Sequence, residues 1–383
     1  MKKYLLSIPV SFLALFLIYK VNSNAFAYAF LVLLLYCAIA AYFEKKEWLR
    51  LFFIYAGSVI MALFIGECYF GSQGDHFSRE YDLVYGDDLI RSDSLLGMVP
   101  MENSQMKSRA FRNDSLLYEV TINIDRNGRR KTPLIDNDSS GALMFFGGSF
   151  TYGDGVEDDE TLPYQFQEAT KGKYQAYNFG FSGHGAHQTL AILEHGLEKR
   201  GASDHSHYFG IYSLITDHVL RGTYSAYNTN SPRYRFDENG NLNYEGLFSK
   251  TAHRFNNYLF KSNLVKALNP LVEKPMQKDV DLMIAMLEQS AKIFEKRYQG
   301  EFYCLLWETA YEAHEGIYEK IREGLNQKGL KYIEINDILT DFSTDPLQYI
   351  IPNDGHPNAL ANQKIAAYLA EFLANTHQTD SVE

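Results

Sequence analysis

The chain has 383 residues, of which 46% are hydrophobic and 22% charged, and its formal net charge is -11. This diffuse acidity leaves no basic stripe to neutralise phosphates, so nucleic acid is excluded as an expected partner. The cysteines Cys37, Cys68 and Cys304 are odd in number and have no metal-ligand spacing, so we expect three small buried hydrophobes without a disulfide framework.

Three apolar stretches occupy the first 70 residues. They run from about Tyr4 to Tyr19, from about Ala25 to Phe43 and from about Leu51 to Gly66. A helix needs roughly 20 apolar residues, with a lower limit of about 17, to cross a bilayer. The first and third stretches are short by that measure, but aromatic residues at their ends can extend them into the interface. We therefore expect a transmembrane anchor of three helices over residues 1–70.

The positive residues around these stretches predict their orientation. They precede the first stretch and separate the second from the third: Lys2, Lys3, Lys45, Lys46 and Arg50. Because cytoplasmic loops carry the excess of Lys and Arg, the Glu44–Arg50 loop is expected inside and the chain after Phe70 outside the cytoplasm. An alternative for the first stretch is a cleaved signal peptide, with Ala25-Phe26-Ala27 resembling a cleavage site, which leaves the exit side unchanged.

Residues 71–140 are expected to form a connecting region with a small β element. The apolar residues from Tyr118 to Ile124 alternate with polar ones and precede Asn127-Gly128, a pattern typical of a strand that enters a hairpin turn. The basic residues of this turn either bind an anionic group or form a solvated turn. They are Arg126, Arg129, Arg130 and Lys131.

Residues 141–383 contain short apolar runs that alternate with helical patterns. The predicted strands are Leu143–Phe146, Tyr174–Phe179, His207–Leu214, Phe302–Trp307 and Tyr332–Ile335. The clearest helical pattern lies near Lys278–Tyr298, and the last helix starts near Asn358, a good N-cap. Buried strands that alternate with helices imply a parallel sheet covered on both faces, with the active site at the carboxyl ends of its strands.

An insertion interrupts this order from about residue 222 to residue 275. Tyr234 and Phe236, a turn at Asn239-Gly240, and then Leu242 and Tyr244 predict an exposed hairpin. Its aromatic residues either line a substrate groove or cap the core.

The strongest local signal is the run Phe146-Gly147-Gly148-Ser149-Phe150-Thr151-Tyr152-Gly153. Here a buried strand ends in two glycines, which let the backbone turn sharply, and a serine. The serine then stands at the carboxyl edge of the sheet, near a helix start whose amides favour developing negative charge. The alternative is a glycine-rich turn with an incidental serine, since a single glycine motif is a weak signal.

Two further loops follow predicted strands. In Asn353-Asp354-Gly355-His356-Pro357-Asn358, the Asp354 carboxylate can fold back to hold the imidazole of His356, which can then take a proton from Ser149 Oγ. A surface histidine in a turn is the alternative. The glycine-rich segment from Asn178 to Gly185 can bring a backbone amide close to an oxyanion.

The order and spacing of these three loops resemble the GDSL, or SGNH, hydrolase family from about Gly141 to the C-terminus. The resemblance implies an α/β three-layer sandwich with a flavodoxin-like five-stranded parallel sheet, and hydrolysis or transfer of acyl esters. It makes Ser149 the nucleophile, His356 the base and Asp354 the orienting acid. The amides of Ser149 and Gly183 are its oxyanion donors.

The sequence departs from this family pattern at two positions. Thr216 stands after the third strand where the family usually has an oxyanion asparagine, and its hydroxyl can donate one hydrogen bond on a shorter arm. Most members place the acid three residues before the histidine, where this chain has Asn353. Asp354 is our choice for the acid, because it is the carboxylate nearest to His356 in the chain.

We expect a multi-pass membrane protein whose catalytic domain lies outside the cytoplasm. It would act as a serine ester hydrolase on acyl esters, such as an O-acetylated envelope glycan or a lipid. An O-acyltransferase with the same triad and a degenerate glycan-binding or assembly protein are the alternatives. No cofactor or metal is expected, since the histidines fit no ligand pattern, and His184 is placed near the pocket.

Overall fold

The computed structural model describes residues 25–72, 82–85, 90–133, 139–223, 231–248, 262–272, 275–308 and 316–380. The chain divides into two compact units. The first unit contains residues 1–80 and 251–274, and the second contains residues 81–250 and 275–383. Part of the predicted insertion therefore belongs to the unit that contains the apolar N-terminal stretches.

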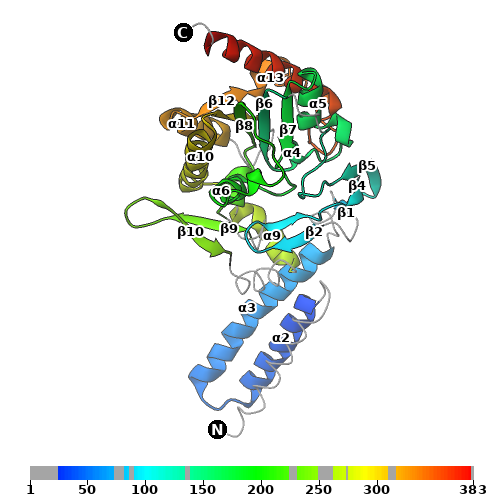
Figure 1. Cartoon of the computed structure of the whole chain (residues 1–383). Helices are drawn as coiled ribbons and strands as arrows, with labels where there is room; N and C mark the ends of the chain where they lie inside the picture. Colours follow the sequence, from blue (N-terminus) through cyan, green and yellow to red (C-terminus); the bar gives the residue numbers. More distant parts are fainter. Residues whose placement is uncertain are drawn as a thin grey trace. The chain divides into compact units, whose positions relative to one another are not determined.

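Two apolar helices lie side by side in the first unit (Figure 1). They are α2 (Ala25–Phe43) and α3 (Glu47–Ser72), and both are long and apolar enough to cross a membrane. They correspond to the second and third predicted helices, whereas the first, at Tyr4–Tyr19, lies outside the described residues. Only residues 44–46 separate α2 from α3, so the predicted loop is shorter than expected because α3 already begins at Glu47.

A buried carboxylate on α3 binds the start of helix α9 (Asn263–Val272) within the same unit. Glu67 is 1% exposed and accepts hydrogen bonds from Ser262 Oγ at 2.5 Å, the Asn263 amide at 2.7 Å and the Leu264 amide at 3.1 Å. The first amides of a helix have no partner inside it, and a negative charge there is favourable. Next to it, Cys68 is exposed, so its predicted burial is wrong.

Five parallel strands form the central sheet of the second unit. They are β6 (Gly141–Gly147), β7 (Tyr174–Asn178), β8 (His207–Leu214), β11 (Glu301–Leu306) and β12 (Lys331–Glu334). Their spatial order is β12-β11-β8-β6-β7, and every neighbouring pair is parallel. Numbered along the chain, this is the 2-1-3-4-5 order of flavodoxin-like sheets. The predicted five-stranded parallel sheet is confirmed.

Helices cover both faces of this sheet, as Figure 1 shows. Successive side chains of a strand point to opposite faces, so Leu143 and Phe145 of β6 join one core, and Met144 and Phe146 join the other. The first core is closed by α5 (Leu162–Ala169) and α13 (Ala359–Asp380). The second is closed by α6 (Ala186–Glu194), α10 (Gln277–Tyr298) and α11 (Ile317–Gln327).

Short elements connect these layers at the sheet edges. They are α4 (Ser149–Tyr152), η2 (Asp158–Glu160), η3 (Leu197–Lys199), α7 (His218–Arg221), α12 (Ile335–Ile338) and η5 (Pro346–Gln348). The predicted helix near Lys278–Tyr298 is α10, and the predicted N-cap at Asn358 is confirmed, since its Oδ1 accepts from the Ala361 amide at 3.0 Å.

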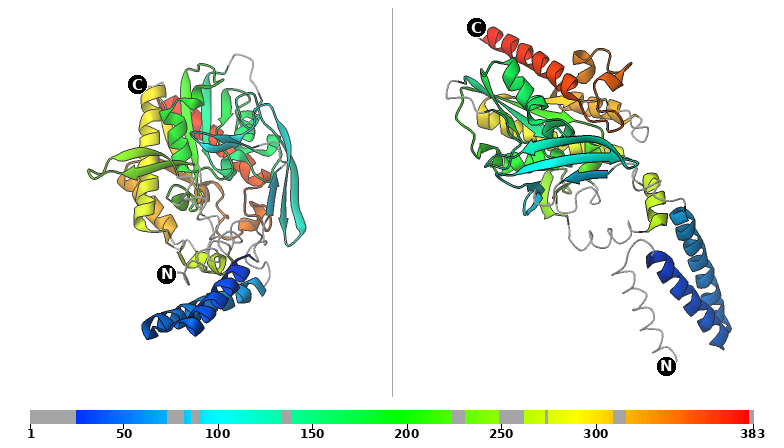
Figure 2. Two further views of the ribbon diagram at one scale, coloured as in Figure 1. Left: turned by 90° about the horizontal axis from the view of Figure 1, so that it is seen from below. Right: turned by 90° about the vertical axis from the view of Figure 1, so that its right-hand side faces the viewer.

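The connecting region forms two small antiparallel sheets, which lie to one side of the parallel sheet (Figure 2). One has the order β1-β4-β5, from β1 (Asp82–Tyr85), β4 (Gln105–Arg112) and β5 (Ser115–Asn123). The other is the hairpin of β2 (Ile90–Asp93) and β3 (Gly97–Pro100). The predicted alternation is present in β5, whose buried side chains form a core with Tyr152 and Phe181 of the main domain.

The insertion contains the predicted hairpin, formed by β9 (Pro232–Phe236) and β10 (Leu242–Leu247). Tyr234 is 1% exposed and belongs to the core that α6 and α10 close, so it caps the core. Phe236 and Tyr244 remain 44% and 40% exposed.

Candidate active site

Ser149 occupies a sharp turn between β6 and α4. β6 ends at Gly147, whose φ of 138° favours glycine. A Cβ atom at Gly147 would lie 2.7 Å from Thr151 Oγ1 and 3.1 Å from the Ser213 carbonyl oxygen. The turn therefore excludes a side chain at this position, and it leaves Ser149 as the first residue of α4, 6% exposed.

Because Gly148 has no side chain, Arg221 can pack against the same turn. A Cβ atom at Gly148 would lie 2.5 Å from Arg221 Nη1 and 2.8 Å from the His184 carbonyl oxygen. Arg221 Nη1 donates a hydrogen bond of 2.7 Å to that carbonyl. Sequence reasoning missed Arg221, because a single arginine in a short helix carries no distinguishing pattern.

The loop of His356 is a tight turn that precedes α13. An isolated bridge joins Ile350 to Pro357, and the Ile351 amide donates to the His356 carbonyl at 2.8 Å. Asn353 and Gly355 have φ values of 62° and 92°, in the left-handed region that asparagine and glycine tolerate best. This backbone folds the residues before His356 back toward its ring.

The structure brings Ser149, His356 and Asp354 together. His356 Nε2 lies 2.8 Å from Ser149 Oγ, and His356 Nδ1 lies 2.6 Å from Asp354 Oδ1. The same carboxylate oxygen accepts from the His356 amide at 3.0 Å. The Asp354 side chain is fully buried and that of His356 is 18% exposed, whereas Asn353 is exposed. Of the two candidate acid positions, Asp354 is therefore the one that contacts the imidazole.

This geometry defines the proton positions that the site needs. An ionised carboxylate only accepts hydrogen bonds, so Nδ1 of His356 donates to Asp354 and Nε2 is left to accept from Ser149 Oγ. Burial by itself lowers the pKa of His356, but the hydrogen bond and the negative charge of Asp354 outweigh it, so that the pKa lies above its usual 6.5. Phe150 packs against the ring at a centroid distance of 5.4 Å.

Gly183 lies in the loop after β7 with a φ of 80°, and a Cβ atom there would meet nothing within 4 Å. Within the described part of the chain, neither its amide nor that of Ser149 donates a hydrogen bond to another residue. Asn178 holds the start of this loop, because its Nδ2 donates to the Thr151 carbonyl at 3.0 Å and its Oδ1 accepts from the Gly180 amide at 3.0 Å. Two amides of this sheet edge are thus without an acceptor among the described residues.

Thr216 follows β8, whose Ser213 pairs with Gly147 of β6, so it belongs to the same sheet edge. It is 1% exposed. Two residues further, His218 is also buried, and its Nδ1 lies 2.6 Å from the Tyr212 hydroxyl. Burial holds the pKa of His218 well below its usual value, so its imidazole is neutral near pH 7.

Arg130, from the predicted basic turn, neither binds an external anion nor faces solvent. Its side chain is fully buried and pairs with Asp158 at 2.8 Å. It also donates to the carbonyl oxygens of Tyr152 and Val156 at 3.1 and 2.6 Å, and to that of Gly153. Both predictions for this residue are therefore wrong, because the turn packs onto the segment that follows α4 and the guanidinium satisfies its carbonyls.

His184 lies in the wall of a cavity that Arg91, Asp93 and Arg129 also line, and its expected place near the active-site pocket stays a prediction. Its Nε2 is 2.8 Å from the Met98 carbonyl, and burial lowers its pKa to about 4. Over residues 25–380, apart from the stretches that the structure does not describe, no group of three His, Cys, Asp or Glu side chains could hold a metal ion.

No protein-family model matches the chain, and no curated protein is similar to it in sequence. Among solved structures, a member of the lipolytic protein G-D-S-L family from Veillonella parvula is 14% identical, over 60% of this chain and 94% of its own, with a TM-score of 0.34. Est24, a carbohydrate acetylesterase from Sinorhizobium meliloti, is 12% identical over 61% and 99%, with a TM-score of 0.31. LAE5, an alpha/beta hydrolase enzyme from the metagenome of Lake Arreo, is 13% identical over 61% and 94%, with a TM-score of 0.36.

The three structures share 12–14% of their residues with this chain. Their identities and TM-scores are too low to assign a role to any residue. The case for the chemistry rests on the contacts among Ser149, His356 and Asp354.

Proposed function

We propose that this chain is a serine ester hydrolase of the GDSL, or SGNH, type that cleaves acyl esters through an acyl-enzyme on Ser149. The observation that carries the proposal is the unbroken chain of contacts from Ser149 Oγ to His356 Nε2 at 2.8 Å, and from His356 Nδ1 to Asp354 at 2.6 Å. A serine hydroxyl is a weak nucleophile unless a base takes its proton, and the base needs a third group that orients it.

The proposed reaction has two halves. Ser149 Oγ attacks the acyl carbonyl carbon while His356 Nε2 accepts the hydroxyl proton, and the carbonyl oxygen becomes negative. The tetrahedral species then expels the alcohol, which takes the proton from His356 and leaves the acyl group on Ser149. A water molecule, deprotonated by His356, releases the acid in the second half.

Two backbone amides support stabilisation of the oxyanion. The Ser149 amide is at the start of α4, and neither it nor the Gly183 amide has an acceptor among the described residues. Preorganised donors of this kind are usually the largest single contribution to such catalysis. We assign Thr216 as the third donor, in place of the usual asparagine, because it is buried at the same sheet edge.

The proposed location is outside the cytoplasm, on a membrane anchor. It is supported by the two apolar helices α2 and α3 and by the basic residues between them, Lys45 and Lys46. The proposed substrate is an acyl ester of an envelope glycan or lipid. Transfer of the acyl group to a sugar hydroxyl in place of water would use the same acyl-enzyme.

Hydrolysis of p-nitrophenyl acetate and longer esters by the full chain in detergent tests the chemistry. Ser149→Ala and His356→Ala should each lower kcat by about 10⁴-fold or more. Ser203→Ala, an exposed serine remote from the three loops, is the matched control and should keep wild-type turnover. A fluorophosphonate probe should label Ser149 alone. A folded wild-type chain that neither turns over esters nor reacts with the probe contradicts the proposal.

The location has its own test. In a Cys68→Ser background, Lys328→Cys places a thiol on an exposed part of the second unit. A membrane-impermeant maleimide should label this thiol in intact cells. Labelling that requires lysis contradicts the extracytoplasmic location and leaves the ester chemistry untouched.

A further inference from the structure

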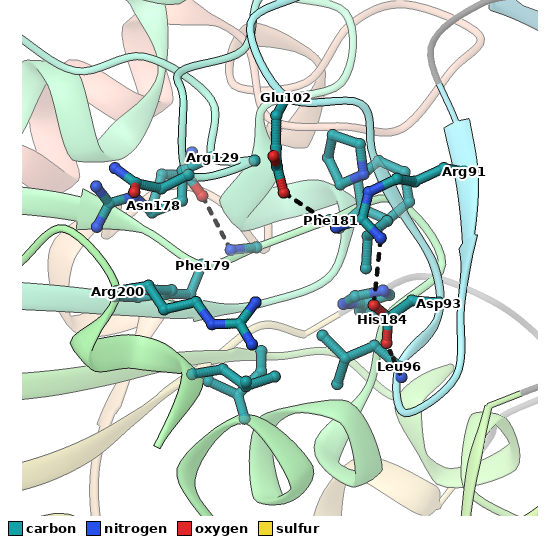
Figure 3. Close-up of a pocket in the computed structure, with 17 residues that line it drawn as sticks. Arg91, Asp93, Leu96, Glu102, Arg129, Asn178, Phe179, Phe181, His184 and Arg200 are labelled. Carbon is teal, nitrogen blue, oxygen red and sulfur yellow. Dashed lines mark hydrogen bonds and ion pairs between the residues drawn. The ribbon is translucent and has the colours of Figure 1, made fainter. Parts of the chain in front are cut away.

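A cavity lies between the accessory strands and the loop after β7, as Figure 3 shows. Its volume is about 90 Å³, room for a few water molecules or one small polar group. Its wall contains three cations and two carboxylates as well as aromatic side chains. The charged residues are Arg91, Asp93, Glu102, Arg129 and Arg200.

Arg129 is buried in this wall, and one of its N–H groups has no hydrogen-bond acceptor among the described residues. It is 8% exposed, and its Nε and Nη2 donate to Asp125 Oδ2 at 3.2 and 3.1 Å. Its guanidinium lies over the rings of Tyr177 and Phe179, at 5.0 and 5.5 Å from their centroids. Its Nη1 is buried and has no hydrogen-bond partner among the described residues. A buried donor without a partner is costly, so a ligand that accepts from it would be favoured.

Arg200 is the one arginine of the wall without an ion pair among the described residues, although the three arginines equal in number the carboxylates Asp93, Glu102 and Asp125. Arg91 pairs with Asp93 at 3.4 Å and with Glu102 at 3.2 Å. Arg129 pairs with Asp125. Arg200 forms no ion pair with any residue that the structure describes. Figure 3 shows Arg129 and Arg200 along one side of the cavity, and Arg91 with Asp93 along the other. On the side that holds Arg129 and Arg200, a negatively charged group would pair with Arg200 and accept a hydrogen bond from Arg129 Nη1.

We propose that this cavity binds the carboxylate of an acidic sugar. A carboxylate supplies the single negative charge that would pair with Arg200. The planar fork of a guanidinium matches the two oxygens of a carboxylate. The volume accommodates the carboxylate, and the sugar ring that bears it would lie at the mouth of the cavity. The choice of a sugar as the bearer rests on the proposed function, whereas the carboxylate site itself does not.

The position of the cavity connects it with the proposed active site. Its wall includes Gly180 and His184, which flank Gly183 in the loop after β7. His184 also presents its carbonyl to Arg221 beside Gly148. An acidic sugar held here would lie against the loop that supplies one of the two oxyanion amides.

Calorimetric titration of the full chain in detergent micelles with sodium glucuronate tests the site. Glucuronate should bind at least about tenfold more tightly than glucose, and acetate should bind more weakly than glucuronate because it lacks the ring. Arg200→Ala should weaken glucuronate binding about tenfold or more, the usual scale for one charged hydrogen bond. Arg200 is exposed, so this variant should fold.

Two controls separate the possible results. Lys199→Ala removes an adjacent exposed cation that does not line the cavity and should bind glucuronate as wild type does. Ser149→Ala should also bind it normally, so a chain without ester turnover can still support this site. Equal binding of glucuronate and glucose, no binding by the folded chain, or an unchanged affinity in Arg200→Ala overturns the proposal. So does inorganic phosphate binding more tightly than glucuronate.

Discussion

His356 Nε2 lies 2.8 Å from Ser149 Oγ, although 207 positions separate the two residues in the chain. Ser149 follows β6, in the middle of the sheet, and the His356 loop follows β12, at its edge strand, and precedes α13. Parallel strands bring their carboxyl ends to one edge of a sheet, so both loops reach the same place. The contact is thus a consequence of the topology, and the predictions below start from it.

The acid of the triad should be Asp354 and not its neighbour. Asp354→Asn should lower kcat by about 10³–10⁴-fold, because an amide can hold the imidazole in the tautomer that cannot accept a proton from Ser149. Asn353→Gly, at an exposed position whose left-handed φ of 62° glycine also adopts, is the matched control and should retain most activity. Steady-state ester hydrolysis measures both, and equal losses in the two variants would contradict the assignment.

The pH dependence should follow His356. Its imidazole must be neutral to accept the proton, and its pKa lies above 6.5 because Asp354 outweighs burial. Activity should therefore be low in acid and rise as the pH passes an apparent pKa above 6.5. Residual activity of Asp354→Asn should rise at a lower pH, since the carboxylate that raises the pKa of the imidazole is lost while burial still lowers it. A profile of kcat/KM from pH 5 to 9 checks this, and an ascending limb below pH 6.5 in wild type speaks against it.

Gly148→Ala should impair turnover more than folding. The new Cβ would lie 2.5 Å from Arg221 Nη1 and 2.8 Å from the His184 carbonyl, so the turn that holds Ser149 must shift. A misplacement of about 1 Å can cost on the order of 10²-fold in rate. Gly329→Ala, where a Cβ meets open space at a φ of 66°, is the comparison and should lose some stability but keep kcat. Wild-type turnover in Gly148→Ala would refute the expectation.

Arg130→Met should destabilise the second unit. The change leaves the Asp158 carboxylate and the carbonyls of Tyr152 and Val156 without their buried partner, a loss of about 3 kcal/mol or more. The melting temperature in detergent should fall by roughly 6 °C or more. Arg126→Met, at an exposed position of the same turn, should stay within about 0.5 kcal/mol of wild type. Similar melting temperatures for the two variants would rule out this role for Arg130.

Glu67→Ala should loosen the start of α9. It removes the acceptor for Ser262 Oγ and for the amides of Asn263 and Leu264. Hydrogen exchange at those two amides should accelerate about tenfold or more, which corresponds to the loss of a charged hydrogen bond. Glu47→Ala, at the exposed start of α3, should leave that exchange unchanged.

Apolar runs and helical periodicity in the sequence predicted those strands and helices whose apolar side chains are buried in the core. All five strands of the parallel sheet coincide with such runs, and α10 coincides with the periodic pattern near Lys278–Tyr298. The accessory sheet was predicted only at β5, because its partners β1 and β4 are short or mixed in composition and their pairing is not local. The role of Arg221 and the contact of Glu67 with α9 could not be predicted either, because both depend on residues that are far apart in the chain.

The sequence by itself determined the apolar helices and the alternation of strands and helices, and it indicated Ser149, Asp354 and His356 as candidate site residues, because each depends on residues that are close in the chain. Tertiary structure alone decided that Asp354 and not Asn353 meets the imidazole, and that Arg130 is buried on the segment after Ser149. It also placed Arg200, which has no ion pair among the described residues, beside Arg129 in the wall of a cavity. These relationships depend on which distant segments the sheet topology brings into contact, and a local pattern of residues does not contain that information.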